Sequence, residues 1–266
     1  MNIRVAKNAG SFYPNNKRDI ETLIKLFNET LQNREDFKEI MKLEPRAIIS
    51  PHAGYIYSGY TANIAHRVLA NRKVKRVVVI GPSHHIYFNG VSGSFYDYYQ
   101  TPLKDMPIDI EYLNIIDKNF GLEFVPQAHE VEHSTETQMP FIAHYQPDVK
   151  VIELIYGNGS IEKLAKIVTW LLEDSLTSVV ISSDLSHFYN LERAKQLDAI
   201  CINGIAKRDN SILDMGCEAC GLTGIEALNI AANKLNLKSY ILDYRTSADV
   251  TGDTNSVVGY LSAAYQ

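Results

Sequence analysis

The sequence predicts an α/β protein with a mainly parallel or mixed sheet flanked by helices. Short apolar runs rich in β-branched residues alternate with longer segments of helical periodicity, which is typical of this fold class. The runs are apolar without alternation, as expected for strands that are buried on both faces. No repeat, low-complexity tract or linker divides the chain, so we expect a single domain over residues 1–266.

Each element is assigned from its own pattern. Apolar residues at three- and four-residue spacing, such as Ile20, Ile24 and Phe27, predict helices, and short runs of Val and Ile predict buried strands. In chain order we expect a helix at 19–40, a strand at 46–50, a helix at 59–72, strands at 76–81 and 149–157, a helix at 160–175, a strand at 178–184, helices at 190–209 and 221–236, and two final segments, 239–245 and 256–265, separated by a polar loop.

Composition restricts the classes of function. The chain has 266 residues, of which 45% are hydrophobic and 21% charged, the usual balance of a soluble globular protein. A formal net charge of −5 argues against a nucleic-acid-binding surface, which is usually basic. No apolar run is long enough to cross a membrane. The N-terminal residues have no signal-peptide core, so we expect a cytoplasmic protein.

Three predicted strands are each followed by one or two histidines. They are "AIISPHAGY" with His52, "VVVIGPSHH" with His84 and His85, and "VVISSDLSH" with Asp184 and His187. Ligands of parallel sheets bind beyond the carboxyl ends of the strands. If these strands are parallel, their histidines converge on one edge of the sheet.

These residues suggest a metal site with a nearby base. Neutral imidazole is a common ligand of Zn, Fe and Cu, so His52 and His84 are candidate metal ligands. His85 is expected in a supporting or loop role. Asp184 could orient an imidazole, share the metal or cap the following helix. His187 is a candidate general base, because the unperturbed pKa of histidine lies near neutrality.

The segment "HEVEH", residues 129–133, formally matches the H-E-x-x-H motif of zinc proteases. That chemistry needs both histidines on one face of a helix. We expect instead a charged loop at His129, followed by a helix that begins with Ser134 as its N-cap. His133 and Glu136 remain candidates to line the same cleft as His52.

Further candidates lie elsewhere in the chain. In "CEACG", Cys217 and Cys220 could form a redox pair, a weak zinc motif or simply two small residues in a tight turn. We expect both to be reduced thiols and neither to bind the metal, with Cys220 near the pocket. The polar loop "TSADVTGDTNS" offers Asp249 and Asp253, and Tyr55 is a candidate pocket residue.

The motifs occur in an order that resembles the Memo family, known in prokaryotes as the Memo-like component of the AmmeMemoRadiSam system. They are "AGSFYP", "PHAGYIYSG", "GPSHH", "EHSTETQMPF", "SSDLSH", "CG" at 220–221 and "SADVTGD…SVVGY", and they span nearly the whole chain. The family is similar in fold to the class III extradiol dioxygenases, which open catechol rings with non-haem Fe(II).

The resemblance implies a set of site residues. His52 and His84 match two metal-ligand positions of the dioxygenase-like site, and His187, with Asp184 beside it, matches the base. The third ligand is a cysteine in certain Memo proteins and a glutamate in the dioxygenases. Counted back from "SVVGY", that position falls on Val250, which cannot bind a metal, with Asp249 next to it.

Three functions follow as hypotheses. The first is a dioxygenase-like cleft that binds Fe(II) or another transition metal weakly, with Asp249 as the third ligand, for redox or oxygen chemistry on a small phenolic or similar ligand. On this hypothesis the metal can be absent from the purified protein. The second is a non-catalytic adaptor that binds a peptide, since animal members bind phosphotyrosine peptides, and the third is a metallohydrolase. Homo-oligomer formation is left open.

Overall fold

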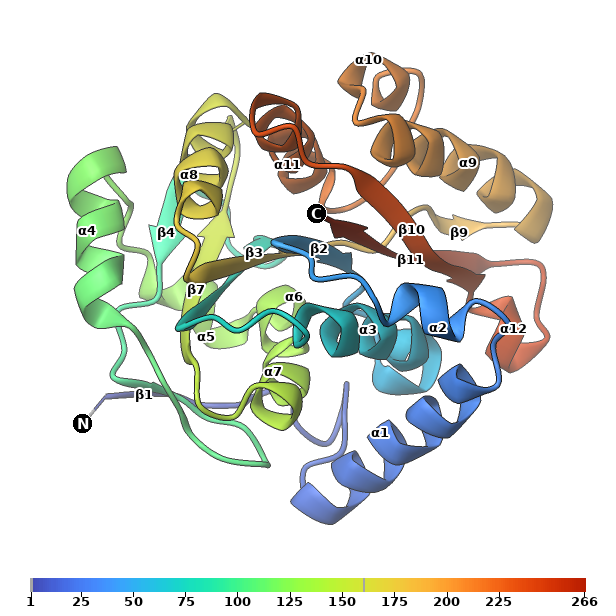
Figure 1. Ribbon diagram of the computed structural model, residues 1–266, viewed down its shortest axis with the longest axis horizontal. Helices are drawn as coiled ribbons and strands as arrows, with labels where there is room; N and C mark the ends of the chain where they lie inside the picture. Colours follow the sequence, from blue (N-terminus) through green and yellow to red (C-terminus); the bar gives the residue numbers. More distant parts are fainter. Residues whose placement is uncertain (1, 160) are drawn as a thin grey trace.

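A computed structural model describes residues 2–159 and 161–266, and its centre is an eight-stranded mixed sheet (Figure 1). The strand order is β10-β11-β2-β8-β3-β7-β4, and β9 pairs with β11. Strands β2, β8, β3 and β7 are parallel, whereas β11, β10 and β4 run antiparallel to their neighbours. The strands are β2 Ala47–Ser50, β3 Arg76–Pro82, β4 Val91–Gly93, β7 Lys150–Tyr156, β8 Thr177–Ser182, β9 His187–Tyr189, β10 Ser239–Thr246 and β11 Val257–Tyr265.

Helices cover both faces of this sheet, as Figure 1 shows. A smaller three-stranded sheet, β1-β5-β6, lies beside it. Its strands are β1 Ile3–Arg4, β5 Tyr98–Tyr99 and β6 Met106–Pro107. The helices are α1 Lys17–Gln32, α2 Phe37–Ile40, α3 Tyr55–Leu69, α4 Ile110–Phe120, α5 Pro126–Val131, α6 His133–Glu136, α7 Met139–Tyr145, α8 Ile161–Glu173, α9 Leu191–Lys207, α10 Asn210–Leu213, α11 Leu222–Lys234 and α12 Ala248–Thr251.

Alternate residues of the parallel strands enter two separate cores. Val78 and Ile80 of β3 pack in the core formed with α4, α8, α9 and α11. Val77 and Val79 of the same strand pack in the core formed with α1, α3 and α7. Since side chains of a strand alternate between faces, both faces are apolar, and the sequence shows an unbroken apolar run. The α/β prediction is therefore confirmed.

Three local predictions differ from the structure. The helix expected over 19–40 is two helices, α1 and α2, with Asn33 as the C-cap of α1. Helix α8 is described over Ile161–Glu173, and Ser160, where it is expected to start, lies outside the described residues. His129 lies in helix α5 and not in a loop, and the N-cap of α6 is Glu132, not Ser134, because the Glu132 carboxylate accepts from the Ser134 N–H.

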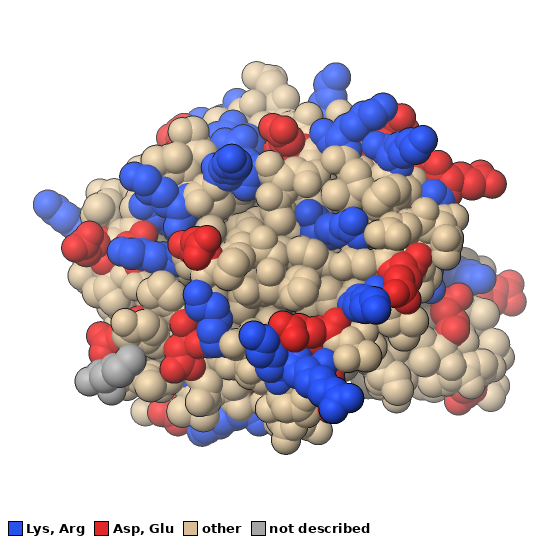
Figure 2. Space-filling view, turned by 60° about the horizontal axis from the view of Figure 1, so that its bottom comes forward, with Lys and Arg blue, Asp and Glu red and all other residues tan. Residues whose placement is uncertain are grey.

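The surface carries charges of both signs. On the face drawn in Figure 2, Lys and Arg side chains are interspersed with Asp and Glu around uncharged areas. Within the described ranges, 2–159 and 161–266, no helix combines the length and apolarity that crossing a bilayer needs.

Candidate metal centre

The carboxyl ends of β2, β8 and β3 lie side by side and bring three sequence-predicted residues together. Ser50, the last residue of β2, pairs with Ser182, the last residue of β8, and β8 pairs along its other edge with β3. The residues that follow these strands include His52, Asp184 and His84. The ring centroids of His52 and His84 are 5.2 Å apart. The strand-end reasoning thus places both imidazoles at one edge of the sheet, as expected.

His52 is almost fully buried, and its partners fix how its ring is protonated. The Ser182 hydroxyl lies 2.9 Å from His52 Nδ1 and donates its proton to the Ser134 carbonyl. The hydroxyl must therefore accept from His52, which places the ring proton on Nδ1. Burial, followed by the nearby His84, lowers the pKa of His52 well below its usual value, so the ring is neutral. Nε2 then carries the lone pair, which contacts the Cys220 sulfur at 3.3 Å and is the atom that can bind a cation.

His84 is held in a similar way by a carboxylate. Glu132, which is fully buried, accepts from the His84 backbone N–H at 2.6 Å and from His84 Nδ1 at 2.8 Å. Burial raises the pKa of Glu132, but the hydrogen bonds from His84 and Ser134 outweigh it and hold that pKa at about 2. Because a carboxylate only accepts, His84 carries a proton on Nδ1, and Nε2 is its remaining nitrogen. Carboxylate–imidazole pairs of this kind commonly orient histidines that bind metals.

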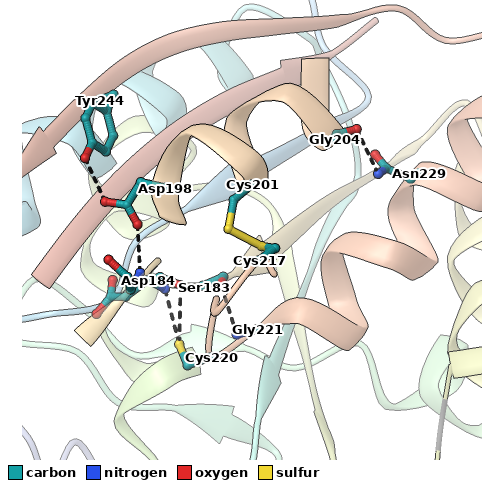
Figure 3. Close-up of a disulfide and its surroundings, with 11 residues drawn as sticks. Ser183, Asp184, Asp198, Cys201, Gly204, Cys217, Cys220, Gly221, Asn229 and Tyr244 are labelled. Atoms are coloured by element: carbon teal, nitrogen blue, oxygen red, sulfur yellow. Dashed lines mark hydrogen bonds between the residues drawn. A yellow bond between two sulfur atoms is a disulfide. The ribbon is translucent and has the colours of Figure 1, made fainter. Parts of the chain in front are cut away.

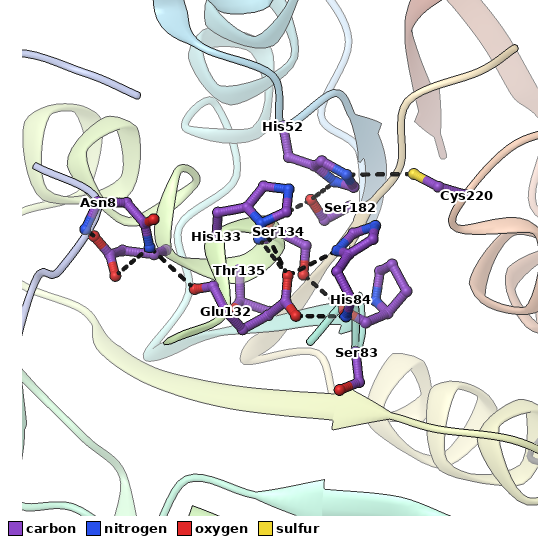
Figure 4. Close-up of polar contacts among 12 residues, drawn as sticks. Asn8, His52, Ser83, His84, Glu132, His133, Ser134, Thr135, Ser182 and Cys220 are labelled. Carbon is purple, nitrogen blue, oxygen red and sulfur yellow. Dashed lines mark hydrogen bonds and ion pairs between the residues drawn. The ribbon is translucent and has the colours of Figure 1, made fainter. Parts of the chain in front are cut away.

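A thiol completes a three-donor group. The atoms that His52, His84 and Cys220 offer as ligands all lie within 4.8 Å of one another, and Cys220 Sγ is 3.3 Å from His52 Nε2 (Figure 4). Burial, with a further contribution from Asp184, raises the pKa of the Cys220 thiol to about 12. Without a cation at this point, Cys220 is therefore a neutral thiol.

His133 lies against the same cluster. Its ring centroid is 4.7 Å from that of His84 and 5.4 Å from that of His52. His133 Nδ1 is buried, makes no hydrogen bond and lies 3.4 Å from Glu132 Oε1. His84, Glu132 and His133 therefore form a second group whose ligand atoms lie within 4.8 Å of one another. Burial lowers the pKa of His133 to about 4.

Asp184 and His187 lie at the same end of the sheet. Asp184 accepts from the His52 backbone N–H at 2.8 Å, and its Oδ2 lies 3.9 Å from His52 Nε2. It therefore orients the His52 loop, while Asn190 caps the following helix α9. Burial raises the pKa of Asp184 to about 7. His187 lies in β9 opposite Val258, and burial lowers its pKa.

Other sequence-predicted residues have different surroundings. The Asp249 carboxylate accepts from the N–H and hydroxyl of Thr246, and Asp249 belongs to none of the three-residue donor groups found among the described residues. Val250, which shares helix α12 with Asp249, is 49% exposed. Asp253 caps a turn by accepting from the Asn255 N–H. The tail loop becomes a short helix, and this is why neither residue meets the histidines.

Tyr55, Glu136 and His85 also lie outside the donor group. Tyr55 is buried in the core, stacks on Phe141 and donates to the Thr137 carbonyl. Glu136 is fully buried and accepts hydrogen bonds from the N-terminal segment, including one from Arg4. His85 is exposed and faces His133, with ring centroids 5.6 Å apart.

The two histidines of the H-E-x-x-H match do not share a helix face. His129 in α5 is buried between Glu153 and Ser92, with its nitrogens 2.8 and 2.9 Å from those side chains. His133 in α6 faces His84 instead. The chain is extended at Glu132 between the two helices, so the zinc-protease geometry does not form.

The expectation that Cys217 is a reduced thiol is wrong for this structure. Cys217 forms a disulfide with Cys201 of α9, whereas Cys220 is free (Figure 3). A Cys217–Cys220 redox pair is excluded in this state as well. Helix α9 packs so that buried Cys201 lies against Cys217 in the turn before α11. The C-x-x-C spacing alone does not indicate this contact. Cys220 lies near the site, as expected, since its sulfur contacts His52.

Two supporting residues were not singled out from the sequence. Glu132 orients His84, and Ser182 fixes the protonation of His52. Glu132 had a visible signal, since it is the acidic residue directly before His133. Ser182 had none beyond its place at the end of a strand.

Comparison with known proteins agrees with the sequence motifs. A family model described as "Memo-like protein" matches residues 4–264. A "MEMO1 family protein" of Archaeoglobus fulgidus is 32% identical, with 97% of each chain covered. Proteins with the same description from Desulfurococcus amylolyticus and Aquifex aeolicus are 31% and 30% identical, covering 97% and 100% of this chain and 96% and 100% of their own. The chain therefore belongs to the Memo family.

Proposed function

We propose that this protein binds a divalent transition metal between His52 and His84 and uses it for redox or oxygen chemistry on a small phenolic or similar ligand. One observation carries the proposal. Each ring has its Nδ1 proton bound to a buried acceptor, Ser182 or Glu132, which leaves the Nε2 lone pair of both as the one that can bind a cation. Two such nitrogens at one edge of a sheet are what a shared cation requires.

The chemistry of the surrounding donors fits such an ion. Imidazole binds Zn, Cu, Fe and Ni, whereas Mg and Ca prefer sites made of oxygen atoms. No proton has to be removed from His52 before it binds a metal, because its pKa lies well below 6.5 and the ring is already neutral. The metal, when bound, would supply a Lewis acid and, if it is redox-active, an electron carrier.

The protein's own residues would bind and deprotonate the ligand. His187 is neutral near pH 7 because its pKa is lowered, so it can accept a proton from a phenol. A hollow of about 290 Å³ lies beside the strand partner of His187, and Val258 and Tyr260 are among its lining residues.

The proposal is tested by metal analysis of protein purified without oxygen, followed by titration with Fe(II) and Zn(II). We expect one metal per chain in the wild type and none in the His52→Ala/His84→Ala variant. His144→Ala, which removes a histidine of α7 outside the donor groups, is the matched control. Unchanged metal binding in the double variant would refute the proposal.

Activity assays then separate the three hypotheses. Oxygen uptake with catechols by the iron-loaded protein supports oxygen chemistry. Ester or peptide hydrolysis by the zinc-loaded protein, without oxygen uptake, supports a hydrolase. Peptide binding that is unchanged in the metal-free double variant supports an adaptor.

A further inference from the structure

The tail loop, where the family resemblance places a third metal ligand, supplies none in this structure. Val250 has no donor atom, and the Asp249 carboxylate is occupied by two hydrogen bonds from Thr246. A site with only two histidines would bind a transition metal weakly, since stable sites usually have three or more protein ligands. Tight binding at the proposed site would therefore take a third donor from elsewhere in the fold.

We infer that Cys220 is the third protein ligand and that this chain has a two-histidine, one-thiolate metal site. The inference rests on the proposed metal site at His52 and His84 and adds the ligand that makes it tight. It reverses the sequence-based expectation that neither cysteine of "CEACG" binds the metal.

The separation of the donors fits one shared ion. Typical Zn–S and Zn–N bonds of about 2.3 and 2.0–2.1 Å at a tetrahedral angle place sulfur and nitrogen about 3.5 Å apart. Cys220 Sγ lies 3.3 Å from His52 Nε2. The ligand atom of His84 lies within 4.8 Å of both other donors, and its side chain is 27% exposed.

The backbone holds the sulfur against His52. The Cys220 N–H donates to the Asp184 carbonyl, and the Asp184 N–H donates to Cys220 Sγ at 3.3 Å (Figure 3). A backbone N–H directed at sulfur favours the thiolate form that a metal needs. The Cys201–Cys217 disulfide fixes the chain three residues before Cys220 to helix α9.

Gly221 lets this segment approach the end of β8. Its N–H donates to Ser183 Oγ at 2.9 Å. A Cβ atom at this position would lie 2.5 Å from Ser183 Cβ and 2.7 Å from the Ser182 carbonyl oxygen, distances that the packing cannot accommodate. Only glycine therefore allows Cys220 to sit this close to His52.

The competing donor group, His84 with Glu132 and His133, is less suited to a metal. Both Glu132 oxygens are occupied, since Oε1 accepts from His84 Nδ1 and the Ser134 N–H, and Oε2 accepts from the His84 N–H. A metal there would displace the hydrogen bonds that orient His84. The only imidazole or carboxylate that Cys220 Sγ contacts among the described residues is His52. A metal ion bound between the two would replace that contact.

Anaerobic titration of the full-length protein with Co(II) tests the inference, because a thiolate ligand gives a sulfur-to-cobalt charge-transfer band in the near ultraviolet. We expect this band in the wild type, one equivalent of Co(II) bound, and protection of Cys220 from iodoacetamide. Cys220→Ser should lose the band and bind Co(II) at least tenfold more weakly. Cys201→Ala/Cys217→Ala, which leaves Cys220 as the sole cysteine, should keep the band.

The outcomes separate this inference from the function it rests on. Co(II) binding without the band and without thiol protection in the wild type overturns the role of Cys220, whether or not Cys220→Ser folds. If that binding is lost in His133→Ala, the ligand is His133. Binding that is unchanged in His52→Ala/His84→Ala, or absent from the wild type, overturns the metal site itself and the Cys220 inference with it.

Discussion

Replacing Glu136 with glutamine should destabilise the protein strongly, although the change is nearly isosteric. The carboxylate is fully buried and accepts five hydrogen bonds. Oε1 accepts from the Asn8 N–H and the Tyr13 hydroxyl, and Oε2 accepts from Arg4, the Lys7 N–H and the Asn8 side chain. In either orientation, the amide NH₂ of glutamine would face at least two donors.

The size of the effect follows from the buried ion pair. Arg4 Nη1 lies 2.9 Å from Glu136 Oε2, and the two side chains are 1% and 0% exposed. Breaking a buried pair by removing one charge costs about 3–5 kcal/mol. Glu153 also lies close enough to interact with Arg4, so part of the charge remains compensated. We therefore expect a loss of about 3 kcal/mol in the free energy of unfolding.

Urea denaturation measures this loss. With an m-value of about 3 kcal/mol/M, the unfolding midpoint should fall by about 1 M. Glu130→Gln is the matched control, because Glu130 pairs with Lys7 at 3.8 Å on the surface, where such pairs contribute about 0–1 kcal/mol. Equal midpoints for the two variants would show that the buried carboxylate of Glu136 contributes no more to the free energy of unfolding than an exposed one.

Three more results are expected. Glu132→Gln should weaken metal affinity by about 10- to 100-fold in calorimetric titration, since it loosens the orientation of His84, and an unchanged affinity would contradict this role. Alkylation under denaturing, non-reducing conditions should label one thiol, and three labelled thiols would contradict the Cys201–Cys217 pairing. Paired alanine substitution of Cys201 and Cys217 should lower the free energy of unfolding by about 3 kcal/mol, as expected for a disulfide that joins residues 16 apart. His66, whose pKa burial lowers from 6.5 to about 4, favours folding when neutral, so its contribution is complete above pH 6.5 and is lost as the pH falls toward 4. Between pH 6.5 and 4.5 the wild type should lose about 2–3 kcal/mol more than His66→Gln in urea denaturation, and parallel curves would refute this.

The sequence predicted the part of the site that depends on strand order. Buried parallel strands are recognisable from their unbroken apolar runs, and residues after their carboxyl ends must meet at one edge. On this ground the sequence predicts that His52, His84 and Asp184 lie at one edge of the sheet. Two things suffice for this prediction: the apolar pattern of each strand, and the fact that parallel strands all end at the same edge of the sheet.

The sequence could not predict contacts made by packing between distant segments. Cys220 reaches His52 because Gly221 lets a turn approach β8, and no spacing within "CEACG" reveals this. Asp249 is a candidate ligand because it is next to the ligand position that the family resemblance implies, whereas the tail loop folds into helix α12 and the Asp249 carboxylate accepts from Thr246. His129 is predicted in a loop before a helix that begins at Ser134, whereas it lies in helix α5 against Glu153 of a distant strand, β7, a contact that the local sequence does not reveal.

The short helix α6 connects the candidate metal centre to the stability of the fold. Its N-cap, Glu132, orients His84, and its last residue, Glu136, binds the N-terminal segment. Arg4 contacts both ends, since it donates to the Glu132 carbonyl as well as to the Glu136 carboxylate. A helix of four residues makes too few hydrogen bonds of its own to be stable alone, so its position depends on these contacts. The buried charges of the N-terminal segment therefore hold in place the carboxylate that leaves His84 Nε2 free for a metal.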